Sequence, residues 1–198
     1  MTVIDRVEIH EFGFEARNLA RDGLAQNITF QRGSSIQVTK YAVVIRTRDG
    51  CRGEYVTHWV ATQSTLGQMQ MLAPRLIGKD ARERIGIYED LKRDIRQFDH
   101  MGHGAIDIAL WDWAGKRQNA SVCELLGGYR KRLPAYASTY MGDRQGGLSS
   151  KEAYADFARH CFDLGYRAFK VHGWSEGNAR EEAENVLHVA AAVGDRMT

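Results

Sequence analysis

Two side chains that could hold a carboxylate and move a proton occur together in the run Lys170-Val171-His172. The surrounding residues 166–172 have the composition of a β-strand, in which residues two apart share a face. Lys170 and His172 are therefore predicted to lie on one face, with Val171 on the other. An ammonium group can bind an anion, and histidine, with an ordinary pKa of about 6.5, can exchange a proton near neutral pH. The spacing also allows a plainer interpretation, with Lys170 a solvent-exposed strand-end lysine and His172 a polar loop residue.

The elements around this pair alternate between strands and helices. A strand over 133–139 leads through a glycine-rich loop to a helix that Ser149 or Ser150 could cap and that ends at Gly165. The strand 166–172 comes next, and then a helix over 178–193. This alternation is typical of parallel strands joined by helices, whose sites lie at the carboxyl ends of the strands.

The preceding part of the chain has a different order, with strands first and helices afterwards. Strands are predicted over 3–12, 36–48 and 51–56, the last two joined by a turn at Asp49-Gly50. The residues Gly13–Ser35 lack periodicity and are predicted to form a polar loop. Three helices are predicted over 62–77, 82–98 and 104–117, and the apolar stripe of the second is Ile85, Ile87, Tyr88, Leu91 and Ile95. A sheet followed by a helical bundle is an α+β arrangement.

The most specific sequence motif of the chain lies between these two parts. Residues 105–128 read AIDIALWDWAGKRQNASVCELLGG, an amphipathic helix, a connector and a double-glycine stop before the strand-like 133–139. This run resembles the hinge between capping domain and barrel in the enolase superfamily, within the mandelate racemase / muconate lactonizing enzyme family. The resemblance implies an α+β capping domain over 1–130, followed over 131–198 by the first two βα units of a (β/α) TIM-type barrel. It also implies a barrel that is incomplete in this chain.

The resemblance assigns the chemistry of the family to Lys170 and His172. The family removes a proton next to a carboxylate while Mg²⁺ holds the resulting enediolate. Its second barrel strand commonly carries K-x-K, and this sequence departs from that pattern with His172 at the second position. We expect Lys170 to contact the substrate carboxylate and His172 to act as the base. A lysine base needs its pKa lowered by several units, whereas a histidine needs little adjustment.

Two further segments resemble the substrate cap of the family: the stretch Gly13–Ser35 and the residues after Gly53-Glu54. Arg17, Arg21, His58 and Trp59 have chemistry suited to a polyhydroxylated acid anion, although any of them could be an incidental surface residue. The polar cap and K-x-H favour an acid-sugar dehydratase. Racemases, epimerases and cycloisomerases of the same superfamily are the alternatives. The resemblance places the Mg²⁺ ligands beyond Thr198, and no metal ligand is assigned in this chain.

The length of the chain limits what it can do alone. A complete barrel needs about 250 residues, and only 66 residues follow position 132, enough for about two βα units. We therefore expect an N-terminal portion of a longer enzyme, with the 198 residues inactive alone. A different class of hypothesis is a non-catalytic capping domain that serves as an oligomerisation or binding module.

Several other residues have a spacing that suggests chemistry. Asp107 and Asp112 look like a carboxylate pair, but Ile106, Ala109, Leu110 and Trp113 make this a helix with a buried face, so a structural role is predicted. His100 and His103 have an i, i+3 spacing, and we expect no metal there. Gly127-Gly128 has no phosphate-loop spacing and is predicted to be a turn.

The composition fits an ordinary α/β protein, with 43% hydrophobic and 26% charged residues. The net charge of +2 is spread along the chain, so neither nucleic acid nor a membrane is an expected partner. The three scattered cysteines favour free thiols in a reducing compartment, and a cytoplasmic protein is predicted. We also expect a homo-oligomer that acts on a small-molecule carboxylate.

Overall fold

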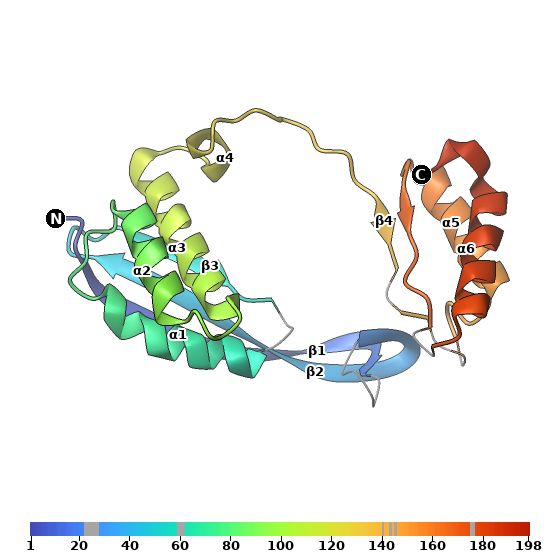
Figure 1. Ribbon diagram of the computed structural model, residues 1–198, viewed down its shortest axis with the longest axis horizontal. Coiled ribbons are helices and arrows are strands. Elements are labelled where there is room, and N and C mark those ends of the chain that lie inside the picture. Colours follow the sequence, from blue (N-terminus) through green and yellow to red (C-terminus); the bar gives the residue numbers. More distant parts are fainter. Residues whose placement is uncertain (22–27, 59–61, 140, 143, 145, 175–176) are drawn as a thin grey trace. The chain divides into compact units, whose positions relative to one another are not determined.

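A computed structural model of the chain describes residues 1–21, 28–58, 62–139, 141–142, 144, 146–174 and 177–198 (Figure 1). The chain forms two compact units. The first unit comprises Met1–Phe14 and Val38–Lys131, and the second comprises Glu15–Gln37 and Arg132–Thr198. The domain boundary predicted at residue 130 stays a prediction.

A three-stranded sheet with the order β1-β2-β3 forms one layer of the first unit. The strands are β1 (Ile4–Arg21), β2 (Ile28–Thr47) and β3 (Arg52–Val56). β2 and β3 are antiparallel, with Val44 opposite Glu54. The predicted Asp49-Gly50 turn joins them, and Gly50 has a φ of +85°, which glycine adopts readily.

The polar loop predicted over Gly13–Ser35 is wrong in the described part of that range. β1 continues to Arg21 and β2 already begins at Ile28, so both strands of a long ribbon occupy most of it. Every residue of β1 after Phe12 is exposed or half-buried. A strand without a buried face needs no alternation of apolar and polar residues, which is why the sequence carries no strand signal in this part of β1.

In the described part of this unit, the sheet is accompanied by α1 (Thr62–Leu76), α2 (Arg84–Asp94), α3 (Met101–Gln118) and the short α4 (Val122–Leu125). The first three confirm the predicted helices to within a few residues. α4 begins with a capping box, in which the Ser121 hydroxyl accepts from the Glu124 N–H and the Glu124 carboxylate accepts from the Ser121 N–H. The α+β arrangement of this unit is the predicted one.

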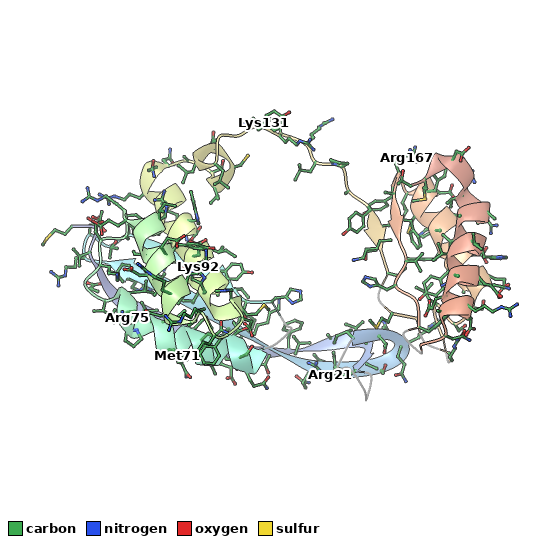
Figure 2. The ribbon with its side chains drawn as sticks, viewed as in Figure 1. Arg21, Met71, Arg75, Lys92, Lys131 and Arg167 are labelled. Atoms are coloured by element: carbon green, nitrogen blue, oxygen red, sulfur yellow. The ribbon has the colours of Figure 1, made fainter. Side chains whose placement is uncertain are left out.

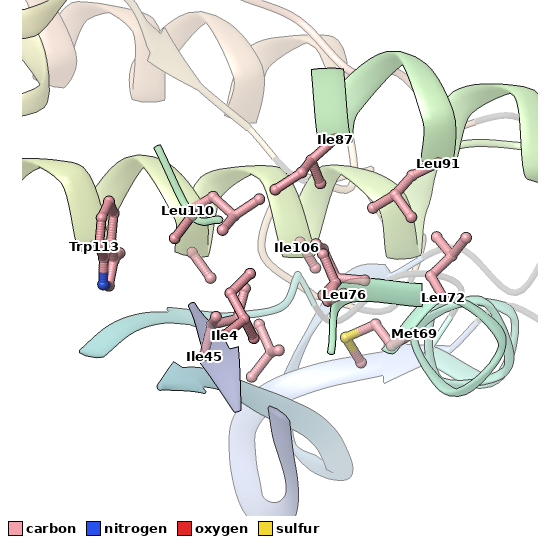
Figure 3. Packing of buried hydrophobic residues seen from close by; sticks show 14 of the residues in the cluster. Ile4, Ile45, Met69, Leu72, Leu76, Ile87, Leu91, Ile106, Leu110 and Trp113 are labelled. Carbon is pink, nitrogen blue, oxygen red and sulfur yellow. The ribbon is translucent and has the colours of Figure 1, made fainter. Parts of the chain in front are cut away.

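The core of the first unit lies between the sheet and α1–α3 (Figure 3). Ile106, Ala109, Leu110 and Trp113 of α3 are buried, as predicted. α3 lies directly against β3, because a Cβ atom at Gly53 would come within 2.0 Å of the Ala109 carbonyl oxygen. One core assignment is wrong: Ile85 is 70% exposed. It lies in the first turn of α2, off the stripe that Ile87 and Leu91 bury.

A buried histidine lies in the first unit between α2 and α3. His103 is 2% exposed, and its ring centroid lies 4.5 Å from that of Tyr88. Its Nε2 has no hydrogen-bond partner. Burial lowers the pKa of His103, an effect that the Asp107 charge opposes, while burial raises the pKa of Asp107 itself. His103 is therefore held neutral inside the unit.

This burial predicts an acid-dependent loss of stability. The pKa of His103 is lower in the folded state than in the unfolded state, so the unfolded chain binds the proton first as the pH falls. The free energy of unfolding should decrease as the pH falls below about 6.5, the ordinary histidine value. His103→Gln should flatten this decrease, measured as urea midpoints at about pH 7.5 and about pH 5.5. Equal pH dependence in the variant and the parent would show that His103 is not responsible.

The second unit contains two βα pairs. β4 (Ala137–Ser138) and β5 (Phe169–Lys170) are parallel, with Ala137 opposite Phe169. α5 (Lys151–Asp163) and α6 (Ala179–Val193) follow the respective strands, and a 3₁₀ turn (Gly194–Arg196) follows α6. The hydroxyl of Ser150 caps α5 and the amide oxygen of Asn178 caps α6. The βαβα order is the predicted one.

The strands of the second unit are shorter than the predicted ranges 133–139 and 166–172. Ladder pairing covers only two residues of each strand. β5 also contacts the last residue of the chain: the Thr198 N–H donates to the Arg167 carbonyl at 3.0 Å, and the Phe169 N–H donates to the Thr198 carbonyl at 2.8 Å. These two bonds have the pattern of a parallel neighbour beside β5, on the edge opposite β4.

Candidate active site

The candidate site lies where β5 ends. Phe169 and Val171 pack against the apolar cluster that α5 and α6 form with Trp174. Lys170, the last residue of β5, and His172, two residues beyond it, alternate with Phe169 and Val171 and do not belong to this cluster, so we place them on the face turned away from the helices. Lys170 is exposed and His172 is half-buried. Both side chains are thus available to a ligand on the face that would line a barrel.

Side chains, rather than ladder pairing, hold the backbone of His172. The His172 N–H donates to Thr139 Oγ1 at 2.9 Å, and the Tyr154 hydroxyl donates to the His172 carbonyl. The Thr139 N–H in turn donates to the Lys170 carbonyl at 3.3 Å. Thr139 is 5% exposed and Tyr154 is fully buried. The peptide groups on both sides of the His172 Cα atom are therefore fixed from β4 and α5.

The chain beyond His172 is also held tightly. The Trp174 N–H donates to Glu182 Oε1 at 2.6 Å, and its indole N–H donates to the Leu148 carbonyl at 2.8 Å. The Arg144 guanidinium stacks on the Trp174 ring at 4.0 Å and pairs with Glu181 at 2.8 Å. A recess of about 230 Å³ lies beside these contacts, between the loops after β4 and β5. Trp174 was not among the residues singled out from the sequence, although it lies two positions after His172.

The other predicted substrate contacts are distributed over both units. Arg17 and Arg21 lie on β1, and Figure 2 labels Arg21 on the ribbon. Arg17 Nε is 3.9 Å from the Glu15 carboxylate, a loose surface pair. His58 comes after β3 in the first unit and is exposed. Trp59 lies outside the described residues.

His58 lines a small pocket of the first unit. The pocket has a volume of about 190 Å³, and Tyr55, Thr65 and His100 are among its lining residues. It lies next to the first turns of α1 and α3, and the Gly102 N–H of α3 donates to the Gln68 side chain at 2.8 Å. The cap role expected for His58 stays a prediction.

The parts of the chain that the structure describes contain no set of ligands for a metal ion. No three His, Cys, Asp or Glu side chains there lie close enough together to hold an ion. His100 and His103 have ring centroids 5.6 Å apart, and His103 is buried against Tyr88. Asp112 accepts from the Glu54 N–H at 2.7 Å and pairs with Lys116 at 2.6 Å, so it ties α3 to β3. The contacts of Asp112 agree with the structural role predicted for it, and the expectation of no metal at His100 and His103 stays a prediction.

Comparison with known proteins identifies the family. Residues 24–127 match the family described as "Mandelate racemase / muconate lactonizing enzyme, N-terminal domain". The chain belongs to this family. The hinge run over 105–128 lies almost wholly inside the matched residues.

Relatives of known structure and sequence extend the comparison to nearly the whole chain. A magnesium-complexed D-glucarate dehydratase from Agrobacterium tumefaciens is 29% identical with a TM-score of 0.80, covering 98% of this chain and 52% of that one. D-Gluconate dehydratase from Thermoproteus tenax is 27% identical over 185 residues, 85% of this chain and 36% of that protein. Muconate cycloisomerase 1-1 from Acinetobacter lwoffii is 32% identical over 119 residues, 60% of this chain and 28% of that protein.

These comparisons confirm the predicted fold class. The chain consists of the capping domain of the mandelate racemase / muconate lactonizing enzyme family followed by the start of its barrel, and the barrel is incomplete in this chain. The chain spans about half the length of the glucarate dehydratase, and the match includes the second unit as well as the capping domain. Among the described residues, no helix is both long and apolar enough to cross a membrane.

Proposed function

We propose that this chain belongs to a magnesium-dependent acid-sugar dehydratase that begins its reaction by removing the proton next to a carboxylate. The observation that carries the proposal is the position of Lys170 and His172 at the carboxyl end of β5, on the face turned away from α5 and α6. Barrel active sites are built at this end of the strands. Support for the reaction type comes from the dehydratases among the relatives.

The two side chains divide the first step between them. The Lys170 ammonium binds and polarises the substrate carboxylate, which favours the negative charge that develops there. The imidazole of His172 takes the α-proton, and the C–H electron pair moves into the carboxylate to form an enediolate. The enediolate then expels the β-hydroxyl, which leaves with a proton as water. Tautomerisation gives a 2-keto-3-deoxy acid.

Magnesium enters the proposal through the relatives. The glucarate dehydratase is magnesium-complexed, whereas the described residues of this chain hold no cluster of metal ligands. We therefore assign no metal ligand among the described residues and derive no step through the ion. Arg17, Arg21, His58 and Trp59 are proposed to contact the hydroxylated end of the substrate.

A cycloisomerase is the second candidate, because muconate cycloisomerase 1-1 is 32% identical over 119 residues. That match covers 60% of this chain, whereas the glucarate dehydratase match covers 98%. Coverage alone does not separate the two reactions, because a 3,6-anhydro-alpha-L-galactonate cycloisomerase from Streptomyces coelicolor matches 82% of this chain and the gluconate dehydratase matches 85%. The preference for the dehydratase rests on the polar cap and on His172 in the K-x-H run. Racemases and epimerases share the α-proton step and differ in the fate of the enediolate.

The test is a substrate panel offered to the complete protein with Mg²⁺. Five- and six-carbon aldonates, glucarate and cis,cis-muconate should be incubated separately, with an EDTA-treated sample as the control. The proposal predicts a 2-keto-3-deoxy acid from at least one sugar acid, detected as its semicarbazone, and no product after EDTA. Lactone formation from muconate alone would favour the cycloisomerase. Failure to turn over any of these acids would favour the non-catalytic module.

A further inference from the structure

Two buried side chains far from each other in the sequence converge on the backbone of His172. Thr139 comes directly after β4, and Tyr154 lies near the start of α5. Thr139 Oγ1 accepts from the His172 N–H at 2.9 Å, and the Tyr154 hydroxyl donates to the His172 carbonyl. We propose that Thr139 and Tyr154 form a clamp that positions the His172 imidazole for proton transfer, an inference that rests on the proposed function of His172.

The clamp replaces the ladder bonds that β5 no longer makes. Ladder pairing between β4 and β5 ends at Ser138 and Lys170, two residues before His172. Backbone groups beyond a strand end need other partners when they are buried. The side chains of Thr139 and Tyr154 supply them, so the direction of the His172 Cα–Cβ bond is fixed where the strand has already ended.

The surroundings of Tyr154 hold its hydroxyl at one place. Its ring is fully buried and packs edge-on against Trp174, with centroids 5.3 Å apart and an interplanar angle of 89°. Gly142 leaves room for it, because a Cβ atom there would lie 2.5 Å from the Tyr154 hydroxyl oxygen and 2.8 Å from Trp174 Nε1. The phenol therefore cannot swing away from the His172 carbonyl without disturbing the packing.

The residue after His172 is fixed in the same way. The carboxylate of Glu182 accepts from the Trp174 N–H and fills the space beside Gly173, where a Cβ atom would lie 1.6 Å from Glu182 Oε2. The Gly142 N–H donates to the Gly173 carbonyl at 3.2 Å. Hydrogen bonds thus hold three successive peptide groups, on both sides of His172 and after Gly173, which is the rigidity that a proton-transfer group requires.

Tyr154 and Thr139 are positioning residues, since they contact the backbone of His172 rather than the substrate. Tyr154→Phe keeps the ring and its packing against Trp174 and removes the hydroxyl that donates to the His172 carbonyl. Proton transfer depends steeply on geometry, so exchange of the α-proton on the His172 face should fall about 10- to 100-fold. KM and exchange from the opposite face of the substrate should stay the same. A purely structural tyrosine would lower the melting temperature and leave this face selectivity unchanged.

The experiment measures face-specific exchange of the substrate α-proton in D₂O with the complete protein, by ¹H NMR. Tyr154→Phe and Thr139→Val should lose exchange on the His172 face, whereas Thr139→Ser, which keeps the hydroxyl, should retain it. Tyr166→Phe is the matched control, because Tyr166 is exposed and lies six residues before His172. If Tyr154→Phe does not fold, the Thr139→Val and Thr139→Ser pair decides.

His172→Asn separates failure of the clamp from failure of the proposed function. If His172→Asn abolishes exchange on one face and folded Tyr154→Phe and Thr139→Val exchange normally, the clamp is overturned and the base assignment stands. If His172→Asn itself exchanges normally, the role of His172 is overturned and the clamp falls with it. Loss of exchange on the same face in all three variants supports both.

Discussion

Replacing His172 by Asn in the complete protein should reduce formation of the keto acid about 10²- to 10⁴-fold, the range that a general base typically contributes. Asparagine keeps a polar side chain of similar reach but cannot accept a proton near neutral pH. His172 lies away from the apolar cluster of the second unit, so the variant should fold normally. Initial rates and circular dichroism on the same samples would check both expectations.

Lys170→Met should act differently, because Lys170 is proposed to bind the carboxylate as well as to polarise it. Both a higher KM and a lower kcat are expected, since the lost ammonium serves the ground state and the transition state. Lys92→Met is the matched control, because Lys92 lies on the exposed surface of α2 (Figure 2).

Near-normal turnover by His172→Asn would mean that a base on the opposite side of the barrel does the essential work and that this strand contributes only charge.

Trp113→Ala should be the most destabilising of the single changes considered in the first unit, by about 3–5 kcal/mol. Trp113 is 1% exposed, and its indole N–H donates to Thr47 Oγ1 at 3.0 Å. Its removal leaves a cavity between α3 and β3 and a buried hydroxyl without its donor. Thermal unfolding followed by circular dichroism measures the loss.

Trp111→Ala is the control for this change, two positions away on the same helix. Trp111 is half-buried, with the Arg84 guanidinium stacked on its ring at 4.5 Å. Its loss removes surface packing rather than core, so a decrease well below that of Trp113→Ala is expected. Equal losses in the two variants would contradict the assignment of the core to the Trp113 side of α3.

The sequence could predict the helices because each buries one face. The spacing of Ile106, Ala109, Leu110 and Trp113 matches the helical repeat, and these residues are buried as predicted. It could not predict the full length of β1, because the outer half of this strand buries neither face and carries no alternation. The assignment of Ile85 to the core was wrong for a related reason. An apolar residue at the start of a helix can lie beside the buried stripe of that helix instead of within it.

The candidate site was partly accessible to the same reasoning. A two-residue spacing is enough to predict that Lys170 and His172 share a face, because strand geometry is local, and their joint role stays a proposal. The contacts of Thr139 and Tyr154 with His172 join residues 33 and 18 positions apart, and no local pattern encodes them. Trp174 could not be found from the sequence because its role depends on its contacts with Tyr154 and the Leu148 carbonyl.

The most direct test of proton transfer at the end of β5 is incorporation of solvent deuterium at the α-carbon of a sugar acid that the complete protein converts. In D₂O with Mg²⁺, ¹H NMR of recovered substrate should show loss of the α-proton signal for the parent protein. With His172→Asn, the α-proton signal should persist when the α-proton of the substrate lies on the face that His172 serves. Dehydration by the parent protein together with unchanged exchange in His172→Asn would contradict the assignment of proton transfer to His172.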